Sequence, residues 1–83
     1  WPDGIQPKSN PPIISRDYNN VTLSSNTKGA SIAYIVSEKK FNPGLDDGWM
    51  VYSKPITLPP GKFLYTMTTR IGFKDSDIIE LEN

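Results

Sequence analysis

The clearest strand signal in the sequence lies at residues 30–37, which read Ala-Ser-Ile-Ala-Tyr-Ile-Val-Ser. The stretch is rich in β-branched and aromatic residues, which are enriched in strands. A second long stretch of the same character, residues 62–71, reads Lys-Phe-Leu-Tyr-Thr-Met-Thr-Thr-Arg-Ile. Turn-forming residues precede both, at 26–29 and at 59–61. The sequence therefore predicts a protein built around two long strands.

Shorter strands are expected on either side of this pair. They fall at residues 13–15, 21–25, 49–52, 56–58 and 75–82. Residues 75–82 could also form a helix capped by Ser76, but the β-branched pair Ile78-Ile79 favours a strand. No stretch shows a sustained apolar period of 3.6 residues. Short strands at regular spacing with turns between them predict an all-β antiparallel sandwich of about seven strands.

The first twelve residues have a different composition from the rest. Residues 1–12 hold four of the eight prolines, and proline removes a ladder donor and keeps its neighbour extended. We expect a poorly packed linker over residues 1–12 that arrives from an upstream domain, followed by one β-sandwich domain over residues 13–83. The chain starts at Trp1 with no initiator methionine and no signal peptide, so we expect a piece of a longer protein.

Composition argues against several classes of function. Nine basic and nine acidic residues give a net charge of zero, which removes the electrostatic case for a nucleic-acid or acidic-membrane partner. The chain has no cysteine and no histidine, so it lacks a thiolate nucleophile, the commonest general base and the commonest zinc ligands. No apolar run is long enough to span a membrane. We predict no cofactor, no metal and no catalytic residue.

Paired carboxylates are the remaining candidates for a metal or for acid–base chemistry. Asp46 and Asp47 precede Gly48 in a loop and could offer oxygens to calcium, and Asp75 and Asp77 form a second pair at strand spacing. Neither pair has the spacing of a full calcium loop. Acid–base catalysis would also need a concave pocket, for which a domain of this size has little room. We therefore interpret both pairs as solvated turn residues.

Three motifs stand in order along the chain and carry a resemblance to a known family. They are Gly29-Ala30-Ser31-Ile32-Ala33-Tyr34, Gly48-Trp49-Met50-Val51-Tyr52-Ser53-Lys54-Pro55-Ile56-Thr57-Leu58 and Arg70-Ile71-Gly72-Phe73-Lys74-Asp75-Ser76. This arrangement resembles the small β-sandwich domain at the C-terminus of many bacterial sulfatases. It is also similar to the C-terminal domain of chitobiases and β-hexosaminidases. The opening Trp-Pro-Asp-Gly-x-Gln-Pro resembles the passage from a sulfatase catalytic domain into this domain.

The resemblance implies an immunoglobulin-like or fibronectin-III-like fold and a non-catalytic accessory domain of an exported, carbohydrate-acting enzyme, with a sulfatase as the first expectation. The resemblance implies no active-site residue in this chain. The implied partner is the upstream catalytic domain of the same chain, which the domain would brace or dock onto. The implied location is the periplasm, the cell surface or the medium. The loop at residues 38–48 departs from the family pattern because it is longer and more basic.

The long strand alternates between two sets of residues, and the resemblance indicates which set faces inward. One set is Phe63, Tyr65, Met67 and Thr69, and the other is Leu64, Thr66, Thr68 and Arg70. The family pattern places the second set inside, which leaves Tyr65 and Met67 outward together with Ile35. An exposed apolar patch usually marks a partner, so we predict that Tyr65, Met67 and Ile35 form the docking interface. If the alternation is reversed, these residues are core.

A carbohydrate-binding domain is the alternative function. Flat aromatic rings match the apolar face of a pyranose, and Trp49 and Tyr52 next to the loop at residues 38–48 would supply them. The partner would then be a polysaccharide. Two exposed, coplanar rings would favour this alternative, whereas buried rings would argue against it.

Overall fold

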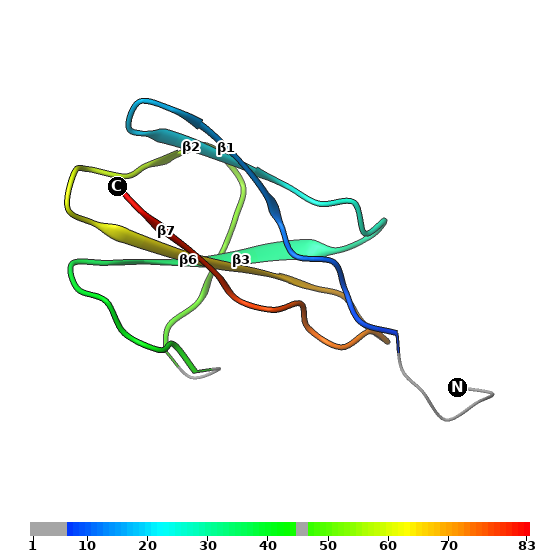
Figure 1. The fold of residues 1–83 in the computed structure, drawn as a ribbon. Helices are drawn as coiled ribbons and strands as arrows, with labels where there is room; N and C mark the ends of the chain where they lie inside the picture. The colour runs from blue at the N-terminus through cyan, green and yellow to red at the C-terminus, as the bar shows by residue number, and fades with distance from the viewer. Residues whose placement is uncertain (1–6, 45–46) are drawn as a thin grey trace.

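The computed structural model describes residues 7–44 and 47–83. Over these residues the chain forms seven strands and no helix (Figure 1). The strands are β1 (Ile13–Asp17), β2 (Asn20–Ser24), β3 (Ser31–Ser37), β4 (Met50–Val51), β5 (Ile56–Thr57), β6 (Phe63–Thr69) and β7 (Ile79–Glu82). Each strand lies within or overlaps a segment predicted to be extended.

The strands form two antiparallel sheets. One sheet has the order β1-β2-β5 and the other the order β4-β3-β6-β7. The longest pairing joins β3 to β6, from Ser31 opposite Thr69 to Ser37 opposite Phe63. The prediction of an all-β antiparallel protein built around two long strands is therefore confirmed.

The apolar core lies between the sheets and draws on both. On β6, Leu64, Thr66 and Thr68 are fully buried, and the Thr66 hydroxyl donates a hydrogen bond to the Ala33 carbonyl oxygen at 2.8 Å. That bond satisfies a polar group that would otherwise be costly to bury. The core cluster consists of Val21, Leu23, Ile56, Leu58 and Leu64, with Ile14, Ile32, Tyr34, Tyr52 and Leu81 packed against it.

Two predicted turns depend on unusual backbone conformations. The turn between β1 and β2 places Tyr18 at a φ of 54°, and the Arg16 Nε donates a hydrogen bond to the Tyr18 carbonyl oxygen. The turn after β6 has Gly72 at a φ of 87° and is closed by the Phe73 amide, which donates to the Arg70 carbonyl oxygen at 3.0 Å. Glycine adopts a positive φ without steric cost, which explains its place in this turn.

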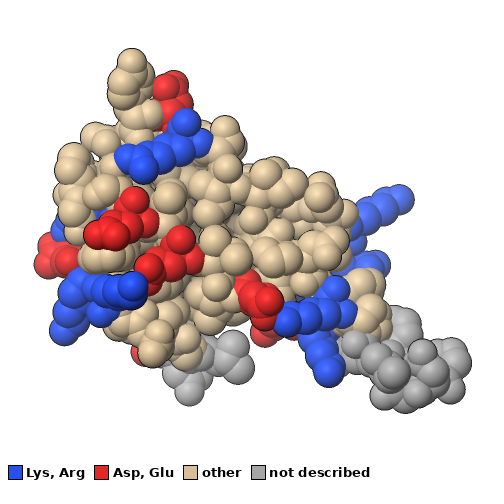
Figure 2. Space-filling view, viewed as in Figure 1, with Lys and Arg blue, Asp and Glu red and all other residues tan. Residues whose placement is uncertain are grey.

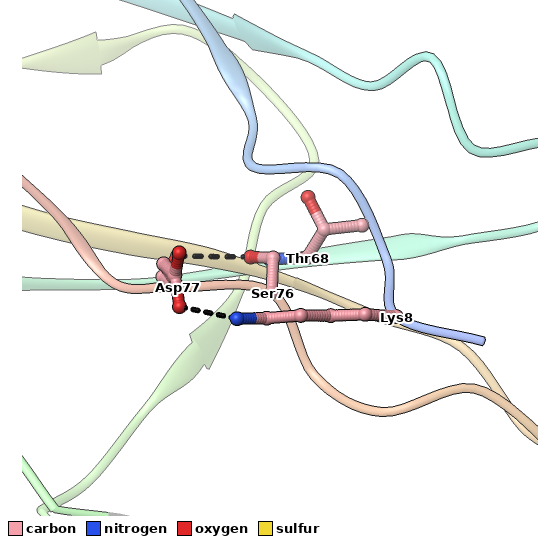
Figure 3. Close-up of polar contacts among 4 residues, drawn as sticks. All are labelled: Lys8, Thr68, Ser76 and Asp77. Carbon is pink, nitrogen blue, oxygen red and sulfur yellow. Dashed lines mark hydrogen bonds and ion pairs between the residues drawn. The ribbon is translucent and has the colours of Figure 1, made fainter. Parts of the chain in front are cut away.

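The last strand is shorter than predicted, because residues 75–78 lie outside it. The Ser76 side chain, only 5% exposed, accepts a hydrogen bond from the Thr68 amide at 2.8 Å and donates one to the Asp77 carbonyl oxygen at 3.0 Å (Figure 3). The Ser76 amide donates to the Thr68 carbonyl oxygen at 2.9 Å. A serine side chain thus takes the place of a strand partner and holds this segment against β6.

Residues 7–9 pack on the sandwich, and they differ in this from the poorly packed linker that we expected over residues 1–12. The Lys74 amide donates to the Pro7 carbonyl oxygen at 2.8 Å, and the Ser9 amide donates to the Lys74 carbonyl oxygen at 2.9 Å. Lys8 Nζ lies 2.6 Å from Asp77 Oδ1 (Figure 3). The backbone amide and carbonyl groups of Lys74, in the turn after β6, are the partners of this segment. Residues 1–6 lie outside the described residues, and a domain boundary at residue 12 stays a prediction.

The Ser76→Ala variant tests the serine contact. Removing the hydroxyl leaves the buried Thr68 amide without an acceptor, which costs about 1–3 kcal/mol. We expect urea unfolding to show a loss of this size. The exposed Ser24→Ala variant on β2 should change the free energy of unfolding by less than about 0.5 kcal/mol. Equal effects of the two substitutions would contradict the role given to Ser76.

Candidate functional site

The residues predicted to dock a partner are buried within the chain. Tyr65 is 2% exposed, Met67 5% and Ile35 9%. They lie on the outer face of the four-stranded sheet, opposite to the side of Leu64 and Thr68, since neighbouring residues of a strand point to opposite faces. The prediction that they form an exposed patch is therefore wrong. A direct part for them in an interface stays a prediction and would require other parts of the chain to move away.

Residues 38–44, called here the cover segment, return across the outer face and cover Tyr65. The Phe41 ring packs edge to face on the Tyr65 ring, with centroids 5.1 Å apart and planes at 73°. The Phe41 amide donates a hydrogen bond to the Tyr65 hydroxyl oxygen at 2.9 Å. Edge-to-face geometry is favourable for aromatic pairs. The long loop that departs from the family pattern thus covers an apolar sheet face.

Ion pairs tie the cover segment to the strands beside it. Lys62 Nζ lies 2.6 Å from Glu38 Oε1, and Lys40 Nζ lies 3.4 Å from Glu80 Oε1. The hydrogen bond and positive charge of Lys62 hold the pKa of the Glu38 carboxyl below its ordinary value. Exposed ion pairs contribute little free energy each, so these two add only slightly to the contacts of Phe41 with Tyr65.

A hollow opens between the cover segment and the C-terminal strand. This outer-face pocket has a volume of about 270 Å³. Tyr65 contributes to the lining of this pocket and is itself only 2% exposed. The pocket is lined by Phe41, Asn42, Pro43, Tyr65, Ile78 and Glu80.

The two aromatic residues of the alternative function do not form a flat exposed pair. Tyr52 is half-buried against the core cluster and packs edge to face on Tyr34, with centroids 6.4 Å apart. Trp49 is also half-buried, and its indole Nε1 donates a hydrogen bond to the Gly44 carbonyl oxygen at 2.8 Å. Trp49 thus supports the end of the cover segment. Sugar binding by Trp49 and Tyr52 stays a prediction.

The end of the sandwich where the N-terminal segment packs has a second hollow. This end of the sandwich, called here the N-terminal pole, consists of residues 7–9 and 70–75, which lie side by side in Figure 1. Ile71 at its tip is 101% exposed. The Arg70 guanidinium carbon lies 4.4 Å from the centroid of the Phe73 ring. The hollow, of about 340 Å³, is lined by Gly29, Ser31, Thr69, Arg70, Ile71 and Asp75.

The acidic residues considered for metal binding are dispersed. Asp77 pairs with Lys8, and the Asp47 carboxylate accepts a hydrogen bond from the Gly44 amide, while Asp46 lies outside the described residues. Residues 7–44 and 47–83 contain no group of three acidic residues that could hold a metal ion. Charges of both signs are interspersed on the visible face (Figure 2). No helix within the described ranges is long and apolar enough to cross a membrane.

Sequence reasoning did not find the outer-face pocket. Its residues come from the loop and from the last strand region, and nothing local links Asn42 to Glu80. One signal was present: Phe41 is a lone aromatic residue in a polar loop. An aromatic side chain in such a place usually packs against something, and here it packs against Tyr65.

The chain is 33% identical over 78 residues to an ulvan-active sulfatase from Formosa agariphila. The alignment covers 92% of this chain but only 12% of the sulfatase. This chain is therefore similar to a small part of a much longer enzyme. No protein-family model matches the chain. No solved structure matches it.

The Tyr65→Phe variant tests the contact between the cover segment and the sheet. It removes the hydroxyl that accepts the Phe41 amide and should lower the free energy of unfolding by about 0.5–1.5 kcal/mol. Hydrogen exchange of the Phe41 amide should become faster. The matched control is Tyr18→Phe, since Tyr18 is 89% exposed and should tolerate the change. A protected Phe41 amide in the Tyr65→Phe variant would rule out the bond.

The Lys62→Gln variant tests the electrostatics of the cover segment. It should raise the pKa of Glu38 toward its ordinary value, as measured by NMR titration of the carboxyl. A lowered pKa in the folded state stabilises the fold above the unfolded pKa, and this contribution is lost as pH falls through the folded pKa. The variant should therefore lose less stability on acidification. Lys54→Gln, at an exposed position, is the control and should leave the Glu38 titration unchanged.

Proposed function

We propose that this chain is a non-catalytic accessory domain of an exported, carbohydrate-acting enzyme, and that the enzyme is a sulfatase. The observation that carries the proposal is the alignment of nearly the whole chain with 12% of an ulvan-active sulfatase. Because the aligned region is only 12% of the sulfatase, the rest of that enzyme is long enough to contain a separate catalytic domain. The parent enzyme would act on a sulfated polysaccharide in the periplasm, at the cell surface or in the medium.

The strand order supports the proposed likeness to immunoglobulin and fibronectin-III domains, and to the C-terminal domain of chitobiases. In an immunoglobulin sandwich, the first, second and fifth strands share one sheet, and the third joins the last two in the other. Here the sheets have the orders β1-β2-β5 and β4-β3-β6-β7. We propose that this chain has the same architecture, with β4 as the added edge strand beside β3.

Docking onto the catalytic domain of the same chain is proposed at the N-terminal pole. The hydrogen bonds of residues 7–9 to Lys74 fix the direction in which the chain approaches the sandwich. A preceding domain would therefore be held near the tip residue Ile71, which is fully exposed. The outer face is less suited to this role because Tyr65, Met67 and Ile35 are already covered.

Carbohydrate binding through Trp49 and Tyr52 remains the alternative. The half-exposed Trp49 ring favours it, whereas the packing of Tyr52 on the core argues against a two-ring platform.

Ile71→Asp in the full-length enzyme tests the docking proposal. A charge placed in the interface should weaken interdomain contact by about 2 kcal/mol or more. We expect the catalytic domain to unfold at a lower temperature and to be cleaved faster by protease, while the 83-residue chain alone keeps its stability. Val51→Asp is the matched control, because Val51 is 73% exposed and lies on β4, outside the pole. A reading frame with no carbohydrate-acting domain upstream of Trp1 would overturn the proposal.

A further inference from the structure

We infer that the outer-face pocket is a binding site for one neutral pyranose unit. The inference concerns residues other than Trp49 and Tyr52 and does not depend on docking at the N-terminal pole. It rests on the size of the pocket, on a lining that combines apolar and polar side chains, and on the contacts that hold the cover segment in place.

The size of the pocket sets the size of the ligand. Pockets for drug-sized molecules span about 300–1,000 Å³, and the outer-face pocket is slightly smaller, at about 270 Å³. This space fits a single six-membered ring with its substituents and does not fit several rings side by side.

Part of the pocket lining is apolar. It consists of the Phe41 ring, the Pro43 ring and the Ile78 side chain. Ile78 is 40% exposed, so its apolar surface beside the hollow remains in contact with water. The C–H face of a pyranose would remove this surface from water, which is favourable in proportion to the area buried.

The lining also includes polar groups that suit hydroxyl groups, Asn42 and Glu80. Glu80 offers carboxylate oxygens that only accept hydrogen bonds, and Asn42 offers an amide that both donates and accepts. Asn42 is exposed, and the Glu80 side chain is 33% exposed. Neighbouring hydroxyls on a sugar ring can donate to the carboxylate and accept from the amide at once.

The charge at the pocket favours a neutral ligand over a cation. Lys40 Nζ already lies 3.4 Å from Glu80 Oε1, so the carboxylate has a nearby counter-charge. A cationic ligand would have to compete with this ammonium group. Hydrogen bonds from hydroxyls to a carboxylate are stronger than those between neutral groups and require no displacement of Lys40.

The pocket is formed before a ligand arrives, which lowers the cost of binding. The Phe41 amide is bonded to the Tyr65 hydroxyl at 2.9 Å, and the Phe41 ring rests on the Tyr65 ring. Beyond the pocket, the Trp49 indole holds the Gly44 carbonyl oxygen at 2.8 Å. The wall that carries Phe41, Asn42 and Pro43 is thus fixed on both sides.

The test is an NMR titration of the ¹⁵N-labelled 83-residue chain with methyl glycosides of neutral sugars: glucose, galactose, mannose, rhamnose and xylose. Methyl glucuronide is the charged comparison. At least one neutral glycoside should bind with a dissociation constant on the order of 1 mM, as expected for so small a ligand. The shifts should fall on the amides of Phe41, Asn42, Ile78 and Glu80.

Three variants test whether the sugar binds through the Glu80 carboxylate or through charges near the pocket. Glu80→Gln should weaken binding at least about tenfold, because it removes a charged acceptor. Glu82→Gln is the matched control, since it changes another exposed carboxylate of β7 that does not line the pocket, and it should bind like the parent. Lys40→Gln removes the ion pair but keeps the carboxylate, and should bind within about threefold of the parent.

Several outcomes would overturn the inference. They are binding of the glucuronide alone, shifts centred on Trp49 and Tyr52, equal weakening by Glu80→Gln and Glu82→Gln, or no shift with any neutral glycoside. A loss with Lys40→Gln as large as that with Glu80→Gln would also overturn it, because the ion pair and not the carboxylate would then govern binding.

Discussion

β6 is buried on both of its faces, and the other features of the molecule follow from this constraint. Leu64, Thr66 and Thr68 face the second sheet, while Tyr65 and Met67 lie on the opposite side and are also nearly inaccessible. A sandwich of two sheets covers only the inner face of each. The chain must therefore supply a further layer over the outer face, and the cover segment does so at Tyr65.

This requirement accounts for both candidate surfaces. The cover segment needs an aromatic residue to pack on Tyr65 and polar residues toward water, and the gap that it leaves beside Glu80 is the outer-face pocket. At the other end of β6, Ser76 and residues 7–9 pack alongside the strand and its turn. We propose docking at the pole, where Ile71 remains exposed, because Tyr65, Met67 and Ile35 are already covered.

Local patterns predicted the strands, because the period-2 alternation and the turn residues act over a few neighbours. The alternation alone left both faces of β6 open, and only the family resemblance indicated that Leu64 faces inward, as it does. Local patterns failed where a segment is fixed by distant contacts: Phe41 lies 24 residues before Tyr65, and Ser9 bonds to Lys74 across most of the chain. Whether a polar loop extends into water or folds back over a sheet depends on such contacts and not on its own composition.

The N-terminal pole and the outer-face pocket lie far enough apart for both to be occupied at the same time. Tyr65 and Arg70 are five positions apart along the same strand and its continuation, which corresponds to about 17 Å at 3.4 Å per residue. A domain seated on the pole would contact Ile71 and leave the gap between Phe41 and Glu80 open to solvent. Residues 7–9 are hydrogen-bonded to the sandwich, so a domain docked on the pole and a sugar unit in that gap would be held by the same small domain. On this arrangement, an accessory domain that only braced its neighbour would have no need of the pocket, whereas one that also held the polysaccharide would use both surfaces.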